Sequence, residues 1–242
     1  MSNSVTIFGD IHGNLPALEA VWADMDWRQL EPRYCLGDLV GYGTFPNEVV
    51  AMIRQQGVPT IMGNYDQGVG HSSDDCGCAY STADARALGE QSIAWTNAHT
   101  SDENKAFLRS LVDSIRLELG SYRVLLVHGS PRKINEYLYE DRSDSSFERI
   151  LNAANADVLV CGHTHLPYHK MLPDGRHIIN AGSVGKPKDN NPDACYIVLT
   201  AESNDLTVEF VRVPYDVERA ALAIEATDMP DAFAGMLRAG RG

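Results

Sequence analysis

The feature that most constrains this chain is a set of five short polar segments, each of which follows an apolar run of strand-like residues. In chain order they are Gly9-Asp10-Ile11-His12, Gly37-Asp38, Gly63-Asn64, Val127-His128 and Gly162-His163-Thr164-His165. A strand in a packed sheet is rigid, and glycine lets the backbone turn sharply where the strand ends. We therefore expect the polar side chains to meet at one rim of an α/β fold.

The residue types in these segments are those that bind hard or borderline divalent cations. Together they supply two carboxylates, one amide and four imidazoles, from Asp10, His12, Asp38, Asn64, His128, His163 and His165. Carboxylate and imidazole suit Mn²⁺, Fe²⁺ or Zn²⁺, whereas a site for softer ions would contain thiolates. A histidine taken alone is more often an ordinary polar residue, but the joint pattern favours metal. We expect two divalent ions, with Mn²⁺ favoured and Fe, Zn, Ni or Co as alternatives.

Composition limits what such a site acts on. The chain has 242 residues and a formal net charge of −13, so it repels polyanions at long range. No basic run offers a track for a nucleic-acid backbone, and we expect no nonspecific nucleic-acid binding. Two divalent ions facing two carboxylates leave a local charge of about +2, which attracts a small phosphoester at short range.

The first part of the chain alternates strand-like and helix-like patterns. We expect a strand at 5–8, a helix around 16–25, a strand at 34–36, a helix at 47–56 closed by Gly57, and a short strand at 59–62. From residue 67 to 81 the apolar period disappears, which predicts an irregular loop beside the site. Two helices that begin at Thr82 and Ser101 then cover one side of the site, up to about residue 112.

The second part of the chain is richer in strands. A hairpin at 115–119 and 123–127 leads to His128, a helix at 144–154 follows, and a strand at 158–161 leads to Gly162. Four further strands, at 168–172, 177–180, 195–200 and 206–213, are predicted to be successive and antiparallel. Asp216 caps a helical tail over 215–242. We expect the whole chain, 1–242, to form a single domain.

The cysteines and the absence of sorting signals bear on the compartment. The five cysteines are odd in number and three lie in apolar runs, so we expect no disulfide framework, and Cys76-Gly77-Cys78 is interpreted as two thiols in a loop rather than a metal or redox site. No leader and no run of transmembrane length is evident, which favours a cytoplasmic protein in a reducing compartment without a membrane partner. A homo-oligomer stays open, since Ala221 and Ile224 suit either a core or an interface.

In order and approximate spacing, these segments resemble the calcineurin-like metallophosphoesterases, from residue 5 to about residue 213. The resemblance implies a four-layer α/β/β/α sandwich of two mixed sheets, with the site at the sheet rims. It also implies two metal sites, one bound by Asp10, His12 and His165, the other by Asn64, His128 and His163, with Asp38 bridging the pair. The implied activity is phosphoester hydrolysis, in which a hydroxide bridging the metals attacks phosphorus in line.

One residue departs from the family pattern. The family usually has histidine after the metal-binding asparagine, where it helps to protonate the leaving oxygen, whereas this chain has Asn64-Tyr65-Asp66. Tyrosine, with an ordinary pKa of about 10, is a poor proton donor to an alkoxide. We therefore expect substrates with acidic leaving groups, such as aryl phosphodiesters or nucleotide-type diesters. Tyr65 is a candidate for catalysis or substrate contact, Asp66 for a hydrogen-bond acceptor behind the ligands, and Arg132 for a phosphate contact.

Other functions stay open at this stage. A phosphomonoesterase or a protein serine/threonine phosphatase uses the same metal chemistry, but Gly41-Tyr42-Gly43 lies where the protein phosphatase branch usually has an arginine. The missing acid at Tyr65 also allows a non-catalytic scaffold that keeps the metal cage. A nuclease acting on long polymers is disfavoured, because it needs a positive track for the backbone.

Overall fold

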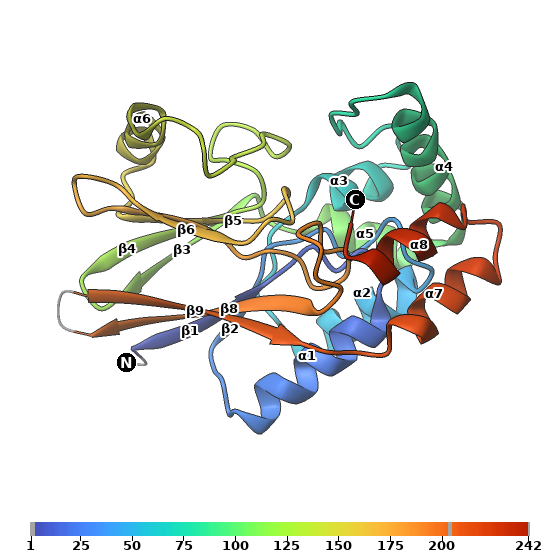
Figure 1. Ribbon diagram of the computed structural model, residues 1–242, viewed down its shortest axis with the longest axis horizontal. Coiled ribbons are helices and arrows are strands. Elements are labelled where there is room, and N and C mark those ends of the chain that lie inside the picture. The colour runs from blue at the N-terminus through green and yellow to red at the C-terminus, as the bar shows by residue number, and fades with distance from the viewer. Residues whose placement is uncertain (1–2, 203–204, 242) are drawn as a thin grey trace.

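Two mixed β-sheets packed face to face form the centre of the computed structural model, which describes residues 3–202 and 205–241 (Figure 1). The first sheet has the order β2-β1-β8-β9, with β1 (Ser4–Phe8), β2 (Arg33–Cys35), β8 (Ala194–Glu202) and β9 (Asp205–Val213). The second has the order β3-β4-β5-β7-β6, with β3 (Ser114–Leu119), β4 (Tyr122–Val127), β5 (Val158–Cys161), β6 (Tyr168–Met171) and β7 (His177–Asn180). The pairs β1–β2, β4–β5 and β5–β7 are parallel, and the other pairs are antiparallel.

The two sheets are held together by the apolar side chains on their facing sides. Ile7 and Ile197 from the first sheet and Leu126, Val160 and Ile179 from the second belong to one buried cluster. Burying a side chain of this size contributes about 1.5–3 kcal/mol. The sheets therefore form a rigid base for the segments that follow their strands.

Helices cover the outer faces of both sheets. On the first sheet, Leu18 of α1 (Leu15–Trp27) and Val50 of α2 (Pro46–Gln56) pack in a cluster with Phe8. On the second sheet, Phe147 of α6 (Asp144–Ala154) packs with Leu159. Figure 1 shows α6 and α1 on opposite sides of the paired sheets, which completes the four layers α/β/β/α.

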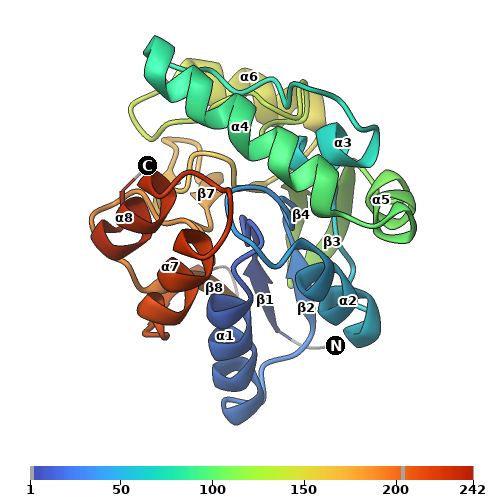
Figure 2. The same cartoon turned by 90° about the vertical axis from the view of Figure 1, so that its right-hand side faces the viewer.

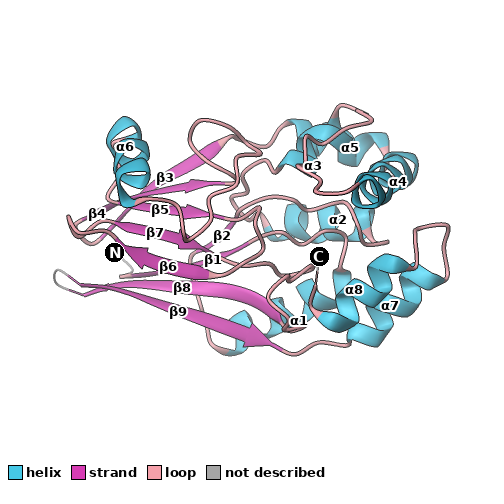
Figure 3. Cartoon of the chain, turned by 45° about the horizontal axis from the view of Figure 1, so that its top comes forward, coloured by secondary structure: helices cyan, strands magenta, loops and turns pink. Residues whose placement is uncertain are grey.

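The remaining helices gather at one end of the sheets, as Figures 2 and 3 show. They are α3 (Asn64–Gly70), α4 (Ala83–His99), α5 (Asp102–Arg109), α7 (Val217–Glu225) and α8 (Ala232–Ala239). The predicted helix starts at Thr82 and Ser101 and the predicted cap at Asp216 are confirmed, because each of these side chains accepts a backbone N–H three residues further on. The predicted helix at 144–154 is also confirmed.

Two predictions about short segments were wrong. Residues 59–62 form only isolated bridges, at Thr60 and Ile61, instead of a strand. The region 67–81 is not irregular throughout, since its first part continues α3. Its glycines suggested a loop, but Gly68 and Gly70 pack closely against Ile93 and Arg109, and this tertiary packing outweighs their low helix propensity.

The predicted run of four successive antiparallel strands was also partly wrong. β6 and β7 form a hairpin, and so do β8 and β9, but β7 runs parallel to β5 and β8 belongs to the other sheet. Ile178 and Ile179 of β7 are both fully buried, which requires a central place in its sheet.

Two further expectations are tested by the fold. All five cysteines are free, so the prediction that they form no disulfide framework is confirmed. Within residues 3–202 and 205–241, none of the helices combines the length and the apolar character needed to cross a membrane.

Candidate metal centre

The structure brings the seven predicted ligands together in one buried place. In two groups the ligand atoms lie within 4.8 Å of one another, Asp10 with His12 and His165, and Asp38 with His128 and His163. Asn64 joins the second group, with its Oδ1 3.0 Å from Nε2 of His128. None of the seven residues is more than 4% exposed. Segments that are far apart in the chain therefore converge as the strand ends predicted.

Most of these ligands sit on strained backbone. The angle φ lies between 50° and 67° at five of them, namely Asp10, His12, Asp38, His163 and His165. A left-handed conformation costs a residue other than glycine about 1–3 kcal/mol, and such strain is typical of functional sites. Glycines admit the close approach, because a Cβ at Gly63 would overlap the carboxylate of Asp38 and one at Gly162 that of Asp10.

Backbone carbonyls fix which nitrogen of each imidazole faces the site. Nδ1 of three rings donates to a carbonyl oxygen, His12 to Val40 at 3.0 Å, His128 to Leu36 at 2.9 Å and His165 to Lys186 at 2.5 Å. Because a carbonyl oxygen only accepts, Nδ1 carries the hydrogen in each ring. When such a ring is neutral, its Nε2 presents a lone pair to the site.

The lone pairs on the Nε2 atoms show whether these residues fit a metal. Nε2 of His12 lies 3.1 Å from Nε2 of His165. Burial lowers the pKa of His12 to about 4 and that of His165 well below its ordinary value, so both rings are neutral near pH 7. Nε2 of His163 is buried and has no hydrogen-bond partner within the described part of the chain. Facing lone pairs and an orphaned nitrogen are unfavourable alone, and a cation satisfies both. The residues therefore fit divalent metal ions.

The carboxylates are electrostatically linked to both groups. Oδ2 of Asp38 lies 3.5 Å from Nε2 of His12 and 3.4 Å from Nε2 of His128. Burial acts to raise the pKa of Asp38, but the charge and hydrogen bond of His128, together with His12 and His163, outweigh burial and hold that pKa well below its usual range. Burial raises the pKa of Asp10 to about 7. Burial acts to lower the pKa of His128, but the charge of Asp38 and its hydrogen bond act in the opposite direction, and the pKa of the ring is raised to about 10. Without metal, His128 therefore carries a proton near pH 7 and Asp10 is partly protonated, whereas Asp38 stays ionised.

Asp66 braces the segments that carry the ligands. Its carboxylate accepts the backbone N–H groups of Asp38 at 2.7 Å, Leu39 at 2.8 Å and Gly63 at 2.9 Å. Burial still raises the pKa of Asp66 to about 7, with Asp38 adding to the shift and the N–H donors opposing it. This placement is that of an acceptor behind the ligands, as predicted.

The two loop cysteines orient Asn64. Its Nδ2 donates to the carbonyl oxygen of Cys76 at 3.0 Å and to Sγ of Cys78 at 3.3 Å, which leaves Oδ1 directed at His128. The two Sγ atoms lie 3.2 Å apart. Both thiols are free and lie in a loop, and their contact with a ligand had no signal in the sequence.

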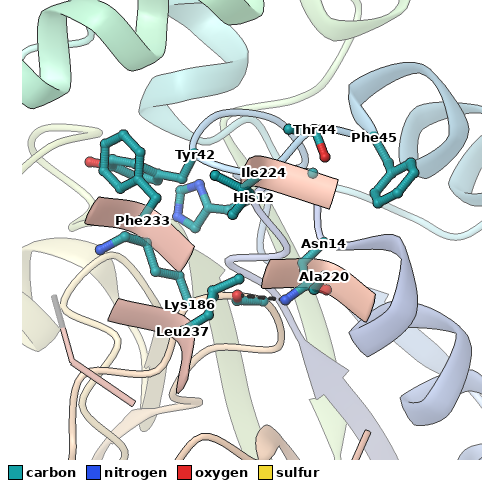
Figure 4. A pocket seen from close by; sticks show the side chains of 13 residues that line it. His12, Asn14, Tyr42, Thr44, Phe45, Lys186, Ala220, Ile224, Phe233 and Leu237 are labelled. Atoms are coloured by element: carbon teal, nitrogen blue, oxygen red, sulfur yellow. Dashed lines mark hydrogen bonds between the residues drawn. The ribbon is translucent and has the colours of Figure 1, made fainter. Parts of the chain in front are cut away.

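A cavity of about 320 Å³ opens over the ligands. Aromatic rings form much of its wall, and among them only Tyr65 was predicted to contact substrate. They are Tyr42, Tyr65, Tyr80, Tyr137 and Phe233. Two lysines, Lys186 and Lys188, complete it. Figure 4 shows a neighbouring pocket, which shares His12, Tyr42, Lys186 and Phe233 with this cavity. Of the two helices expected to cover the site, α4 lines the cavity through Leu88, whereas α5 packs against α3 instead.

Tyr65 is fixed in the cavity wall. Its ring centroid lies 5.5 Å from that of His12 and 4.7 Å from that of Tyr42, and the ring fills the space that a Cβ at Gly41 would need. The side chain is 1% exposed, and its hydroxyl has no hydrogen-bond partner among the residues described. Burial raises the pKa of Tyr65 well above its ordinary value, so it is a weaker acid than free tyrosine.

Arg132 lies outside this cavity, which corrects the expectation that it contacts phosphate. Its guanidinium is half-exposed and pairs with Glu136, and it lines a separate surface hollow with Lys133. The carboxylate already neutralises its charge. The positively charged side chains that line the cavity are Lys186 and Lys188. Neither lies in one of the five polar segments that supply the predicted ligands.

Comparison with known proteins gives consistent matches. Residues 4–204 match the calcineurin-like phosphoesterase superfamily domain. An uncharacterized protein from Methanocaldococcus jannaschii is 33% identical over 258 residues, which cover 100% of both proteins. A probable metallophosphoesterase from Methanothermobacter thermautotrophicus is 34% identical over 104 residues, 43% of this chain and 54% of that protein. The crystal structure of a metallophosphoesterase from Sphaerobacter thermophilus has a TM-score of 0.75 at 28% identity, with 98% of both chains covered.

These matches agree with the two mixed sheets and with the two groups of metal-binding side chains. They confirm the predicted α/β/β/α fold and identify the protein as a metal-dependent phosphoesterase. On this evidence, the chain belongs to the calcineurin-like phosphoesterase superfamily.

Proposed function

We propose that this protein is a phosphodiesterase that hydrolyses small or nucleotide-type esters with good leaving groups. The observation that carries the proposal is Tyr65, which occupies the position after Asn64 and is buried with a raised pKa. A group that does not readily release its proton gives little help to a departing alkoxide. Esters whose leaving oxygen is stable as an anion need no such help.

We assign the metal ligands according to the two groups of side chains. Asp10, His12 and His165 hold one ion, Asn64, His128 and His163 hold the other, and Asp38 faces both. When bound, two divalent ions lower the pKa of water and withdraw charge from phosphoryl oxygens. The donor set of carboxylate, amide and imidazole favours Mn²⁺ in our proposal, with Fe, Zn, Ni or Co as alternatives.

The chain itself positions the reacting groups. The carbonyl oxygens of Val40, Leu36 and Lys186 hold three imidazoles in one orientation, and Asp66 braces the segments of Asp38 and Gly63. The rings of Tyr42, Tyr80 and Tyr137 offer faces on which an aryl group or a nucleobase stacks.

The size of the cavity supports a small substrate. Its volume of about 320 Å³ is within the range of small-molecule sites. Its walls come from both halves of the chain, from Tyr42 to Phe233, which supports our proposal that residues 1–242 act as a single domain. Among the residues described, no arginine lines the cavity, which disfavours a phosphoserine or phosphothreonine substrate.

A series of aryl phosphodiesters with graded leaving-group pKa, assayed with Mn²⁺, tests the proposal. We expect the rate to fall steeply as the leaving-group pKa rises, and Tyr65→His to flatten that dependence. Full activity on alkyl esters with a flat dependence would show that another group supplies the proton. Absence of any Mn²⁺-dependent hydrolysis would favour the scaffold alternative.

A further inference from the structure

Two lysines in the cavity have no anionic partner. Lys186 is 5% exposed and Lys188 is partly buried, and both line the cavity that is also lined by five of the seven candidate ligands. Within residues 3–202 and 205–241, neither ammonium group has a hydrogen bond or a salt bridge. The ammonium of Lys186 lies 4.6 Å from the ring centroid of Tyr42. By contrast, the ammonium of Lys170 pairs with Asp144 at 2.9 Å.

An unpaired ammonium in a buried place is unfavourable. Removing an ion from water costs several kcal/mol unless an opposite charge or hydrogen bonds compensate. An anion between the two side chains offsets this penalty. The feature that is missing from the cavity is therefore a negative ligand.

The loop that carries the lysines is anchored to the metal ligands. Oγ of Ser183 donates to the carbonyl oxygen of Asp10 at 2.7 Å and accepts the N–H of Lys186 at 2.8 Å. Nδ1 of His165 donates to the carbonyl oxygen of Lys186. The N–H of Gly185 donates to the carbonyl oxygen of Asp10 at 3.0 Å. The lysines are thus held in a fixed relation to the candidate centre and do not belong to a free surface loop.

From these observations we propose that Lys186 and Lys188 form a subsite for a second phosphate group, adjacent to the phosphorus that is attacked. The favoured substrate is then a nucleotide-type phosphoanhydride diester, in which the group that leaves is itself a phosphate ester. This inference rests on the proposed function and narrows its substrate class.

The chemistry explains why a weak acid at Tyr65 suffices. Oxygen from water forms a new bond to phosphorus, and its proton passes to solvent. The bond between that phosphorus and the bridging oxygen breaks, and the electron pair remains on that oxygen as part of the departing phosphate. Phosphate bears such charge readily, since its second pKa is about 6. The ammonium groups balance the charge, so no proton donor is required.

Kinetics on two matched substrates test the subsite. The first is a dinucleoside triphosphate, and the second is the p-nitrophenyl ester of thymidine 5′-monophosphate, which has no second phosphate. With Mn²⁺-loaded protein, we expect Lys186→Met and Lys188→Met to lower kcat/KM for the triphosphate by about 30-fold or more, the loss typical of a broken buried charge pair. The loss on the nitrophenyl ester should be several times smaller. Lys133→Met, at an exposed lysine outside the cavity, is the matched control.

Calorimetry with methylene diphosphonate gives a second readout that does not depend on turnover. Its affinity should fall about 30-fold in the lysine variants, recover partly in Lys188→Arg, and stay unchanged in Lys133→Met. Equal losses on both substrates, or unchanged diphosphonate affinity, would overturn the subsite. If the wild type hydrolyses neither ester, the proposed function is wrong, and the calorimetry alone decides whether the lysines bind phosphate. Manganese content per chain, measured for every variant, excludes a loss caused by an empty centre.

Discussion

The floor of the cavity and its cover are held in different ways. We call the seven predicted ligands the floor, and the loop 78–81, α4, Tyr137 and α8 the cover. Six residues of the floor follow strands and the seventh, Asn64, begins α3. Five of the seven lie on left-handed backbone, and three imidazoles are fixed by carbonyl groups. In the cover, Cys78 forms a hydrogen bond to a ligand, Asn64, whereas Phe233 and Tyr137 make ring contacts.

This difference assigns separate tasks to the two regions. Rigid strand ends suit metal ligands, whose geometry tolerates little error, whereas loops and helix faces vary more readily and determine which ester fits. Changes to the floor should therefore affect metal binding and turnover together. Changes to the cover that leave the hydrogen bond between Cys78 and Asn64 intact should affect substrate affinity alone.

The largest expected effect is that of Asp38→Asn in the floor. Asp38 is the residue whose carboxylate approaches histidines of both groups, so its loss removes a shared ligand and one negative charge. We expect kcat/KM on bis(p-nitrophenyl) phosphate to fall on the order of 10³-fold, because metal-derived charge stabilisation amounts to several kcal/mol. Steady-state kinetics and metal content per chain measure both effects. Asp205→Asn, at an exposed position of β9, is the control. If Asp38→Asn retains both activity and full metal content, the assignment of metal binding to the floor is wrong.

Metal removal should reveal the strain in the floor. Facing lone pairs and left-handed ligands are tolerated better when cations are bound, so loaded protein should be more stable than chelated protein. Saturating one site at 100 times its Kd contributes about 2.7 kcal/mol, and a chain of this size gains about 2–4 °C in Tm per kcal/mol. We expect Tm to rise by about 5–10 °C with Mn²⁺. The shift should shrink in Asp38→Asn and persist in Tyr137→Ala; an equal shift in all three would contradict the assignment.

The pH dependence of metal binding sharpens the contrast further. In metal-free protein the pKa of Asp10 is about 7 and that of His128 about 10, and both groups must lose a proton to bind metal. Affinity should therefore rise with pH. Loading both ions should release about two protons at pH 6, where both groups are protonated, and about one at pH 8, where Asp10 is already ionised. Titration calorimetry in buffers of different ionisation enthalpy counts these protons. A constant number across this range would contradict the prediction.

How much the sequence could predict also differs between the floor and the cover. Six of the seven ligands were found because they follow a strand, and Asn64 was found because it follows a short apolar segment that forms only isolated bridges. That information is local. The helices with side-chain caps at Thr82 and Ser101 were predictable for the same reason.

The cover depends on contacts that no local pattern contains. Phe233 reaches the cavity because α8 packs on α7 in a buried apolar cluster, and because the N–H of Asn190 donates to the carbonyl oxygen of Gly240. Lys186 and Lys188 lie there because their loop is tied to Asp10 and His165. Contacts between residues so far apart in the chain are fixed by tertiary packing. Only the loop and a helical tail could therefore be predicted from the sequence.

The smallest expected effect, that of Tyr137→Ala, tests whether the cover is separable from the floor. The Tyr137 ring lines the cavity, and its centroid lies 4.1 Å from that of His163. Losing one aromatic contact costs about 0.5–1.5 kcal/mol, so KM should rise about 2- to 10-fold. Metal content and kcat should hardly change, since no ligand is removed. Tyr139→Ala is the matched control, because Tyr139 stacks on Tyr137 with centroids 5.7 Å apart but does not line the cavity. If Tyr137→Ala lowers metal content, the ring helps to hold His163 in place, and floor and cover act as one unit.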